Sequence, residues 1–570
     1  METTILKDNS LAAGRTRRLL PVLLSFCMFS TGASGLVNEY VLATMTTYIL
    51  GNSIEQFSIV IAAMMLMMGV SGLVQQRLTD SNLIGKFMGI EVTMAVVGSI
   101  APLAIYAAFG YFTDHFHFVH YAFVLSVGFL IGFEIPIVMR IIEQQNIGLK
   151  TNLALVYGLD YIGAFVGAII WVKVLLVNFP LAQISFIVAG TNFCIAAITV
   201  IYFMAIGEIR SRTLPLAVLA ITSAFLVIGY NVSSQVSDEL EQRFYDDPIV
   251  HKQTSRYQHL VLTYARANND LRLYINGNTQ FSSLDEARYH DLIVHPAMAV
   301  APHARNVLIL GGGDGLALRE VLKYPRVESV SLIDLDPAMV QMAASHPAMR
   351  DLNRDAFADA RVTVDTPDGI DVVNVRDVYL PETDTFSKEA KTQRVASVSV
   401  FNLDADQFLN ERHGQRWDVV IIDFPDPGSV ELAKLYSRQF YSKLRAHLAP
   451  GAMVAIQSTS PFHARDVFVG IGSTLRASGY RALPYQHNIA SFAQWGFHLA
   501  WISGATEDEM KERIRNVTSF EVETEYMTPE VMSASLAFGK NELNAEHECV
   551  NSIMNPCLAI AYTNYSWITE

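Results

Sequence analysis

Long apolar runs fill the first 230 residues of the chain and then stop. Each run reaches roughly the 20 residues that a helix needs to cross a bilayer. We therefore predict a multi-pass α-helical membrane domain over residues 1–230, with about seven transmembrane helices. The runs cover residues 20–50, 57–75, 84–112, 119–142, 153–177, 181–206 and 213–230. The first run is long for one helix, so a break within it would change the count.

The pattern shortens after a polar connector at residues 231–256. Residues 257–263 and 271–275 read as strands, and the dipeptide at 276–277, Asn-Gly, is a turn signal. These features predict a small antiparallel β-sheet. A helical pattern follows the sheet and completes a segment that we place at 257–300.

From residue 301 to residue 505, apolar strands alternate with helical stretches, which predicts a parallel, doubly wound α/β sheet of the Rossmann-like type. Strands are expected at 306–310, 329–334, 398–403, 419–422, 453–457 and 497–503, with helices over 316–323 and from Pro337. A charged, turn-rich stretch at 365–396 interrupts the alternation and is interpreted as a surface insertion. Residues 506–570 are a C-terminal extension that begins as a charged helix.

Charge divides the chain at the same boundary. The first 230 residues hold 11 basic and 11 acidic residues, whereas the whole chain holds 41 and 55, so the net charge of −14 belongs to residues 231–570. An acidic domain does not fit nucleic-acid binding, which needs a basic surface. It favours a cationic substrate through electrostatic steering.

Basic residues in the short loops predict how the helices are oriented in a cell membrane. They precede the first run and then recur in every second loop, at Arg15, Arg17, Arg18, Arg77, Lys86, Arg140, Lys150, Arg210 and Arg212. The N-terminus is therefore expected in the cytoplasm. Seven helices would place residues 231–570 on the other side, which fits poorly with a cytosolic nucleoside substrate, so the side is left open.

Four acidic residues, Glu39, Glu91, Glu134 and Asp160, lie within or close to the apolar runs. Charged groups are costly in lipid and usually face the interior of a bundle. The first interpretation is a path or site for a cation such as a polyamine. The second is a structural one, in which they pair with basic or polar neighbours or lie near the membrane interface. We favour the second interpretation.

Small residues also recur in the runs, at 32–35 and at Gly158, Gly163 and Gly167. Such residues let helix backbones approach closely in lipid. Loose packing without a dedicated contact motif is the expectation here.

The four cysteines fall into two groups. Cys27 and Cys194 lie in apolar runs, where a thiol behaves as a small hydrophobic group. Cys549 and Cys557 are eight residues apart; a disulfide between them is an alternative, but free thiols are the expectation. No Cys/His spacing suggests a metal site, so no metal is expected.

A glycine-rich stretch, Gly311 to Gly315, follows the first strand of the α/β region. Glycines there allow a tight turn and a close approach of the backbone to a ligand. Asp334 ends the next strand about 20 residues later, where an acid can bind ribose hydroxyls. Asp404 follows the next complete strand, near the expected adenine. The glycine loop alone would fit a dinucleotide or an S-adenosyl compound, or no ligand.

Asp423 and Asp426 follow a very apolar strand in the sequence IDFPDP. Two carboxylates three residues apart at the carboxyl edge of a central strand project into the ligand crevice of such a sheet. The pair fits a site that holds a cation and takes up a proton. The sequence contains neither a phosphate-binding P-loop nor a nucleophile elbow.

Several motifs in a fixed order resemble the spermidine synthase family. They are Tyr257-Gln258, LYING at 273–277, QFSS at 280–283, Asp285-Glu286, Tyr289-His290, His295-Pro296 and GGGDG at 311–315. The resemblance covers roughly 257–345 and 398–503, and the apolar runs resemble the membrane-bound subset of these synthases. It implies a polyamine aminopropyltransferase that uses decarboxylated S-adenosylmethionine as co-substrate, with no permanently bound cofactor. The acceptor would be a diamine such as putrescine, giving spermidine and methylthioadenosine.

The resemblance also implies roles for single residues. Decarboxylated S-adenosylmethionine would be held by Gln258, Gly311, Gly313, Asp334, Asp404 and Ala405, and the amine or aminopropyl groups by His290, Asp314 and Asp426. Asp423 would be the proton acceptor, with Tyr289 beside it. The chemistry agrees, because a protonated amine has a pKa near that of lysine, about 10.4, and must lose a proton before it attacks carbon.

Two stretches depart from the family pattern. Residues 428–432 replace a run of small residues and proline, and 490–497 has no tyrosine at the expected place. With the insertion at 365–396, these departures bear on amine selectivity more than on the reaction.

Two other functions stay open. One is an S-adenosylmethionine-dependent methyltransferase, which has no general need for the acids Asp314, Asp423 and Asp426. The other is a non-enzymatic polyamine transporter or sensor, which would not need Asp423 and Tyr289. The expected partners are a small-molecule diamine, a nucleoside sulfonium and the lipid bilayer, without nucleic acid; a homo-oligomer is also left open.

Overall fold

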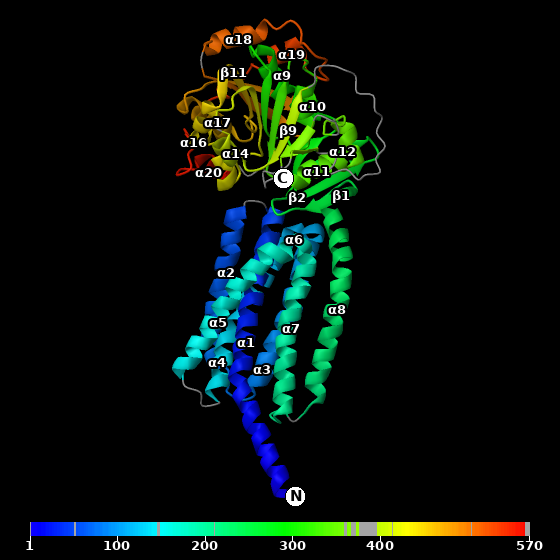
Figure 1. The fold of residues 1–570 in the computed structure, drawn as a ribbon, viewed down its shortest axis with the longest axis vertical. Coiled ribbons are helices and arrows are strands. Elements are labelled where there is room, and N and C mark those ends of the chain that lie inside the picture. The colour runs from blue at the N-terminus through cyan, green and yellow to red at the C-terminus, as the bar shows by residue number, and fades with distance from the viewer. Residues whose placement is uncertain are drawn as a thin grey trace. The chain divides into compact units, whose positions relative to one another are not determined.

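The structure of the chain is a computed structural model, and Figure 1 shows its helices and strands. It describes residues 2–50, 53–144, 149–209, 211–357, 362–365, 372–374, 396–412, 414–502 and 504–564. The chain divides into two compact units, a helical unit at Met1–Ile249 and an α/β unit at Val250–Glu570. Most of the insertion expected at 365–396 lies outside the described residues.

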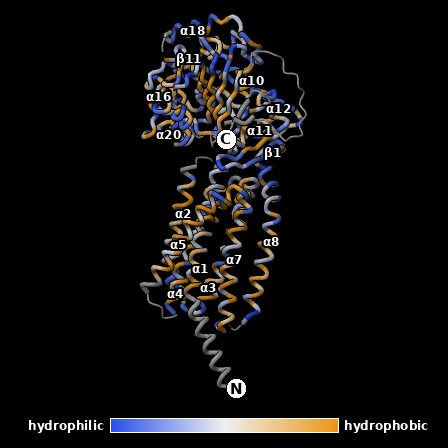
Figure 2. The backbone as a smooth tube through the Cα atoms, viewed as in Figure 1, coloured by the Kyte–Doolittle hydropathy of each residue, from blue (hydrophilic) through white to orange (hydrophobic). Residues whose placement is uncertain are grey.

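The helices of the helical unit form a bundle and are long, except for the three-residue α6. They are α1 (Glu2–Leu50), α2 (Ser53–Val74), α3 (Leu83–Tyr111), α4 (Phe116–Glu143), α5 (Leu149–Ile170), α6 (Leu176–Asn178), α7 (Leu181–Ala205) and α8 (Thr213–Glu241). In the described residues, six helices are long and apolar enough to cross a membrane, at positions that match six of the seven predicted runs. The first run lies in α1, which continues without a break. Figure 2 shows apolar residues along the length of these helices.

Helix α1 packs closely along α5, and glycines make the approach. A Cβ at Gly163 would collide with the carbonyl oxygen of Phe29, and a Cβ at Gly167 would contact that of Ala33 at 2.7 Å. A Cβ at Gly32 would collide with the backbone of Asp160. The expectation of loose packing is therefore wrong for this helix pair, because small residues on both helices bring the backbones together.

The connector expected at 231–256 has regular structure. Helix α8 continues to Glu241 and a short 3-10 turn follows at Gln242–Phe244. Ser233, Ser237 and Leu240 are buried on one side of this last part of α8, so a polar sequence forms an amphipathic helix there. A strand then occupies Ile249–Thr254.

Four strands form a small sheet in the order β1-β2-β3-β4: β1 (Ile249–Thr254), β2 (His259–Ala265), β3 (Asp270–Ile275) and β4 (Asn278–Ser282). The pairs β2–β3 and β3–β4 are antiparallel, as predicted for this segment. Asn276 and Gly277 both have positive φ, as the predicted turn between β3 and β4 requires. Helix α9 (Glu286–Val300) leads from this sheet into the larger one.

The larger sheet has nine strands in the order β12-β13-β11-β10-β5-β6-β9-β7-β8. They are β5 (Asn306–Gly311), β6 (Ser329–Asp334), β7 (Val362–Asp365), β8 (Val372–Asn374), β9 (Ser397–Asn402), β10 (Trp417–Asp423), β11 (Leu448–Gln457), β12 (Arg481–Ile489) and β13 (Ala493–Trp501). The six strands from β11 to β7 are parallel, which confirms the predicted Rossmann-like sheet. Strand β12 was not predicted, because its proline and polar residues do not look like a strand; it is an edge strand, where both are tolerated.

Helices cover both faces of this sheet. They are α10 (Leu316–Leu322), α11 (Pro337–Ser345), α12 (Pro347–Leu352), α14 (Ala405–Glu411), α15 (Val430–Lys434), α16 (Arg438–Ala446) and α17 (Arg465–Ala477). Alternate residues of β10 enter opposite cores: Val419 and Ile421 pack with α9, α10 and α11, whereas Val420 and Ile422 pack with α14, α16 and α17. Burial on both faces explains why this strand is a continuous apolar run.

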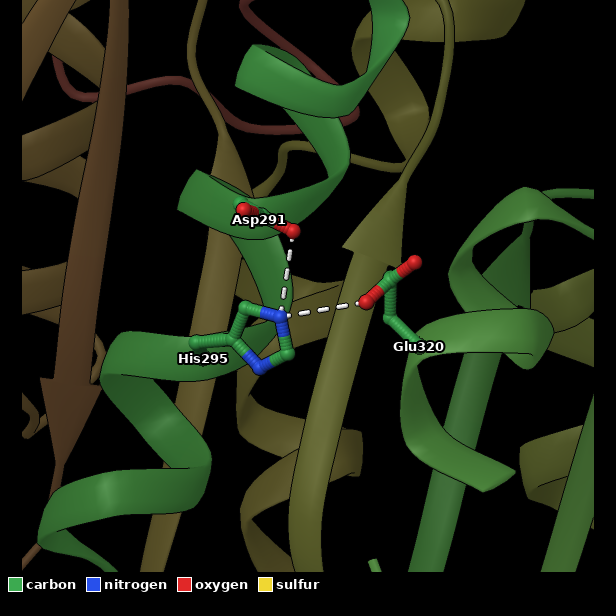
Figure 3. A group of neighbouring side chains, drawn as sticks. All are labelled: Asp291, His295 and Glu320. Atoms are coloured by element: carbon green, nitrogen blue, oxygen red, sulfur yellow. Dashed lines mark hydrogen bonds and ion pairs between the residues drawn. The ribbon is translucent and has the colours of Figure 1, made fainter. Parts of the chain in front are cut away.

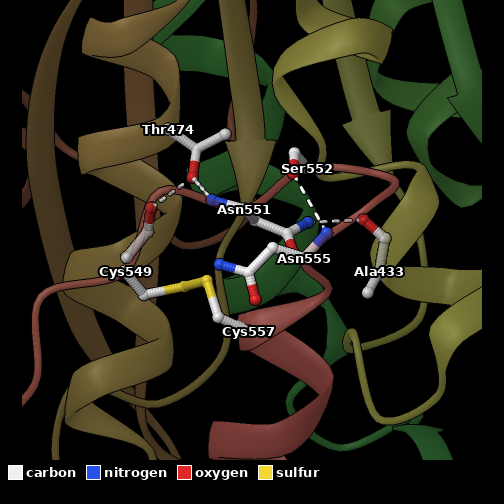
Figure 4. Close-up of a disulfide and its surroundings, with 8 residues drawn as sticks. Ala433, Thr474, Cys549, Asn551, Ser552, Asn555 and Cys557 are labelled. Atoms are coloured by element: carbon white, nitrogen blue, oxygen red, sulfur yellow. Dashed lines mark hydrogen bonds between the residues drawn. A yellow bond between two sulfur atoms is a disulfide. The ribbon is translucent and has the colours of Figure 1, made fainter.

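The C-terminal extension packs onto the α/β unit through α18 (Glu507–Arg515), α19 (Pro529–Ala534) and α20 (Cys557–Asn564). Met510 and Met532 of the first two helices are buried in one core, and Leu558 of α20 is buried in the other. Cys549 and Cys557 form a disulfide, with Cα atoms 6.0 Å apart (Figure 4). The expectation of free thiols is therefore wrong; Cys549 is buried against the same core as α20, which brings the two sulfurs together.

Candidate active site

The carboxyl ends of β5 and β10 lie side by side at the centre of the sheet. Asp423 is paired with Gly311 across these strands. Gly311 has φ +85°, and a Cβ on it would collide with the carbonyl oxygen of Asp423. The close contact explains the need for glycine at this position. The sheet extends from β5 through β6 and β9 on one side and through β10 and β11 on the other, so the strand order reverses at β5. Ligands bind at such a reversal point in doubly wound folds.

Asp334, at the end of β6, is held by the glycine loop. Its Oδ2 accepts a hydrogen bond from the backbone N–H of Gly313 at 2.9 Å, and its Oδ1 accepts one from that of Asp336 at 2.9 Å. Burial raises the pKa of Asp334 to about 7, although both N–H groups act in the opposite direction. A Cβ on Gly313 would collide with Asp334, so the glycine is required for this contact as well.

Gln258, Asp404 and Ala405 lie beside the same strand ends. The backbone N–H of Gln258 donates to the Ser255 hydroxyl at 3.1 Å, and that hydroxyl donates to Asp336 at 2.7 Å. Asp404 caps α14 by accepting from the N–H of Gln407 at 3.0 Å, and it lies 3.4 Å from the Lys434 ammonium group. Ala405 is buried behind this cap. The predicted nucleoside positions are therefore gathered at the ends of β5, β6 and β9; their ligand contacts stay a prediction.

Asp423 and Tyr289 form the centre of the site. The Tyr289 hydroxyl, on α9, donates to Oδ1 of Asp423 at 2.5 Å. Burial and the neighbouring Asp314 together raise the pKa of Asp423 to about 6, against the opposing effects of His290 and the Tyr289 hydroxyl. Burial and the neighbouring Asp423 raise the pKa of Tyr289, which keeps its proton. Asp423 is thus a carboxyl group whose pKa lies near neutral pH, and the hydrogen bond that the Tyr289 hydroxyl donates fixes its orientation.

His290 is held next to this pair by an ion-paired chain. Its Nδ1 lies 2.8 Å from a carboxylate oxygen of Glu286, and Glu286 receives two hydrogen bonds from Arg319, at 2.9 and 3.0 Å. Burial alone lowers the pKa of His290, but Glu286, Asp314 and Asp423 outweigh burial and raise it to about 9. A protonated His290 donates to Glu286.

Asp314, in the glycine loop, is a further half-buried acid close to Asp423. It accepts a hydrogen bond from the N–H of Leu316 at 2.9 Å, and burial raises the pKa of Asp314. His290 and Asp314 act on the charge of Asp423 in opposite directions. The predicted amine-contacting residues therefore lie around the predicted base.

Asp426 accepts hydrogen bonds from three side chains. Gln457 donates to Oδ1 at 2.8 Å, and Thr459 and Tyr562 donate to Oδ2 at 2.9 and 3.0 Å. Burial raises the pKa of Asp426, and these three donors counteract it. Thr459 has φ +61°, which is strained for a β-branched residue and is characteristic of functional sites. Asp426, in the loop after β10, is therefore a hydrogen-bond acceptor whose orientation is fixed by three donors.

Several of these partners were missed from the sequence. Gln457 is the last residue of β11 and Thr459 follows it, on the same sheet edge as Asp423, so their position at the end of a predicted strand was a usable signal. Arg319 lies on the first helix after the glycine loop, where it looks like an ordinary surface cation. Tyr562 lies 136 residues beyond Asp426 and carried no local signal at all.

A second buried cluster joins Asp291, His295 and Glu320 (Figure 3). Nε2 of His295 lies 3.1 Å from a carboxylate oxygen of each acid. Burial lowers the pKa of His295, but the two carboxylates outweigh burial and raise it. Asp291 also accepts from the backbone N–H groups of Tyr526 and Met527, at 2.7 and 2.9 Å. The ligand atoms that a metal would need are engaged in hydrogen bonds, so the cluster ties α9, α10 and the C-terminal extension together.

Comparison with known proteins supports the family resemblance independently of the geometry of the site. A family model described as the spermine/spermidine synthase domain matches residues 286–388 and 379–512. Polyamine aminopropyltransferase 2 of Ralstonia nicotianae is 36% identical over 480 residues, covering 84% of this chain and 86% of the relative. Polyamine aminopropyltransferase 1 of Streptomyces coelicolor is 37% identical over 484 residues, covering 84% and 83%.

The similarity also reaches the helical unit. Polyamine aminopropyltransferase 2 of Aquifex aeolicus is 31% identical over 544 residues, which is 95% of this chain and 98% of the relative.

A crystal structure of spermidine synthase in complex with the transition-state analogue AdoDATO has a TM-score of 0.39 at 20% identity, covering 52% of this chain and 87% of that one.

Proposed function

The chain belongs to the spermine/spermidine synthase family, and we propose that it transfers the aminopropyl group of decarboxylated S-adenosylmethionine to a diamine such as putrescine. The family makes the chain an aminopropyltransferase, and the proposal adds the donor, the acceptor and the roles of the residues. The observation that carries it is the half-buried Asp423–Tyr289 pair, surrounded by Asp314 and Asp426 beside the glycine loop.

The proposed step is a direct displacement. One ammonium end of the diamine loses its proton to Asp423, and the freed lone pair of the nitrogen attacks the aminopropyl carbon attached to the sulfonium. The carbon–nitrogen bond forms as the carbon–sulfur bond breaks, and methylthioadenosine leaves as a neutral thioether. Asp423 with a pKa of about 6 is ionised at neutral pH and can accept this proton.

Asp426 and Asp314 supply negative charge for the part of the diamine that stays protonated. A buried carboxylate interacts more strongly with an ammonium group than an exposed one, because less solvent screens the pair. Tyr289 keeps Asp423 oriented through its hydrogen bond. On the donor side, Asp334 lies where the ribose hydroxyls of the nucleoside would be held.

Incubating membranes that contain the protein with decarboxylated S-adenosylmethionine and a panel of diamines tests this proposal. We expect methylthioadenosine to appear together with the aminopropylated amine, and to appear fastest with putrescine. S-adenosylmethionine labelled in its methyl group is the parallel donor. Methyl transfer without aminopropyl transfer would overturn the proposal, and preference for another amine would overturn its acceptor.

We also propose that the helical unit spans the cell membrane and that the α/β unit faces away from the cytoplasm. Arg140, at the end of α4, donates to Asp80 in the loop between α2 and α3 at 2.8 Å, so these two basic loops lie at one end of the bundle. Helix α8 begins after the third basic loop, with Arg210 and Arg212, and its far end leads into the α/β unit. The Cys549–Cys557 disulfide supports the same side, because disulfides persist in oxidising compartments.

Protease treatment of intact cells or spheroplasts tests this orientation. Cleavage of the α/β unit from outside, with a cytoplasmic marker protein intact, is the expected result. Protection of the α/β unit until the membrane is opened would overturn the proposed side.

A further inference from the structure

The C-terminal extension reaches the acceptor side of the active site. Tyr562, on α20, donates its hydroxyl to Oδ2 of Asp426 at 3.0 Å. The Tyr562 ring packs against Gly428, two residues after Asp426. A Cβ at this glycine would lie only 3.1 Å from the ring, so a small residue is needed there. Tyr562 therefore contacts the Asp426 loop through both its hydroxyl and its ring.

Helix α20 is fastened to the α/β unit just before this tyrosine. The disulfide joins Cys557, the first residue of α20, to Cys549, and Leu558 is fully buried behind it. Between the cysteines, Asn551 is held by three hydrogen bonds. Its backbone N–H donates to the Thr474 hydroxyl at 2.9 Å, and its side-chain amide donates to the carbonyl of Ala433 at 2.7 Å. Its backbone carbonyl accepts from the backbone N–H of Arg438 at 2.9 Å. Figure 4 shows the disulfide beside the contacts of Asn551 with Thr474 and Ala433.

The fastening matters because α20 has only eight residues. A helix of that length is marginal without tertiary support. The support on its first turn comes from the disulfide and Leu558, and Tyr562 lies about one turn further along. The position of the Tyr562 hydroxyl thus depends on the covalent link at the start of the helix.

We propose that Tyr562 is a positioning residue for the diamine, acting through Asp426, and that the Cys549–Cys557 disulfide keeps it in place. The inference rests on the proposed function, in which Asp426 binds the protonated part of the acceptor. With Tyr562 present, one oxygen of Asp426 is held by two donors and the other by Gln457, so the carboxylate has a single orientation. Without Tyr562, the carboxylate loses one of these restraints and binds the acceptor less well.

The direct test is Tyr562→Phe, which removes the hydroxyl and keeps the ring. Because Asp426 loses one of its three hydrogen bonds and keeps the other two, we expect the KM for the diamine to rise roughly three- to tenfold, which is the size of one ordinary net hydrogen bond. The KM for decarboxylated S-adenosylmethionine and kcat should stay within about twofold. Tyr480→Phe is the matched control, since its hydroxyl donates to the carbonyl of Tyr441 at 2.9 Å in the core, away from Asp426.

The disulfide is tested on the folded enzyme with dithiothreitol, which gives two electrons and two protons to the cystine and becomes a cyclic disulfide itself. Reduction should raise the KM for the diamine in the unmodified enzyme and should add little in Tyr562→Phe. The Cys549→Ser/Cys557→Ser variant should resemble the reduced enzyme and should not respond to dithiothreitol, although Cys27 and Cys194 remain.

The outcomes separate this inference from the proposed function. Absence of aminopropyl transfer in the unmodified enzyme would overturn the proposed function. Transfer with an unchanged KM for the diamine in Tyr562→Phe would overturn the role of Tyr562 alone. An equal effect of reduction with and without the Tyr562 hydroxyl would overturn the role of the disulfide in holding it.

Discussion

Both units of the molecule hold carboxyl groups in their interiors, half-buried at the candidate site of the α/β unit and fully buried at Glu91, but they treat them differently. In the α/β unit, Asp334, Asp423 and Asp426 each accept hydrogen bonds from identified donors. In the helical unit, Glu91 on α3 is fully buried, and within the described residues neither of its carboxylate oxygens has a hydrogen-bond partner. Buried polar groups are nearly always paired, because an unpaired one costs free energy.

The difference teaches how each unit uses its acids. Around Asp423 the neighbours set both the orientation and the charge of the carboxyl, as a reaction with cationic substrates requires. Around Glu91 no hydrogen bond from the described residues orients the carboxyl group, although Cys27 of α1 and Glu134 of α4 lie close enough to interact with it electrostatically. Buried acids of the first kind should therefore be sensitive to substitution, and Glu91 should tolerate an isosteric one.

Asp423→Asn should have the largest effect. The amide cannot accept the proton of the acceptor, so kcat should fall by about 10²- to 10⁴-fold, while the KM for each substrate changes by only a few-fold. Steady-state production of methylthioadenosine measures this. Asp508→Asn, at a 92% exposed side chain on α18, is the control and should keep full activity. Full turnover in Asp423→Asn would show that Asp423 is not the base.

Arg319→Met should have the largest effect on stability. Arg319 is buried and pairs with both Glu286 and Glu320, so its loss removes a buried cation that two carboxylates share. Among the described residues, Glu286 would keep only His290 as an ion-pair partner, and Glu320 would keep His295 and Lys323. We expect the free energy of unfolding of the α/β unit to fall by about 3–5 kcal/mol. Denaturant unfolding of the detergent-solubilised chain, followed by tryptophan fluorescence, measures it.

Arg305→Met is the matched control for this change. Its side chain is 65% exposed and lies 3.8 Å from Glu328, so the loss should stay below about 1 kcal/mol. Equal losses in both variants would mean that the buried ion pairs do not hold the site together.

The pH dependence should be a smaller effect with a defined direction. Asp423 must be deprotonated to act as base, and its pKa is about 6, so kcat/KM for the diamine should fall as the pH drops through about 6. Asp314 raises the pKa of Asp423, so Asp314→Asn should move this acid limb to lower pH. A profile that stays in place, or moves to higher pH, would contradict the proposed coupling.

Glu91→Gln should have the smallest effect. The amide has the same shape, and the carboxylate that it replaces has no hydrogen bond to lose within the described residues. We expect the thermal stability of the solubilised chain and its transfer activity to stay within experimental scatter of the unmodified protein. A clear loss of either would show that Glu91 has a role like that of the acids in the α/β unit.

Much of the molecule could be predicted from its sequence, for local physical reasons. The apolar runs identified six of the long helices, and β6 was predicted with its observed bounds, because hydrophobic period and length are written in adjacent residues. Asp423 and Asp426 were predicted to project into the ligand crevice because they follow the carboxyl end of a central strand, and β10 is indeed central in the observed sheet.

The sequence by itself thus determined the two-part organisation, the α/β class and the positions of Asp334 and Asp423. Only the tertiary structure decided which distant groups support them: Arg319 beneath Glu286 and His290, Tyr562 beside Asp426, and the disulfide in place of two thiols. The reason is that such contacts join segments that are far apart in the chain. Their geometry depends on how whole helices and strands pack, and no local pattern of residues records it.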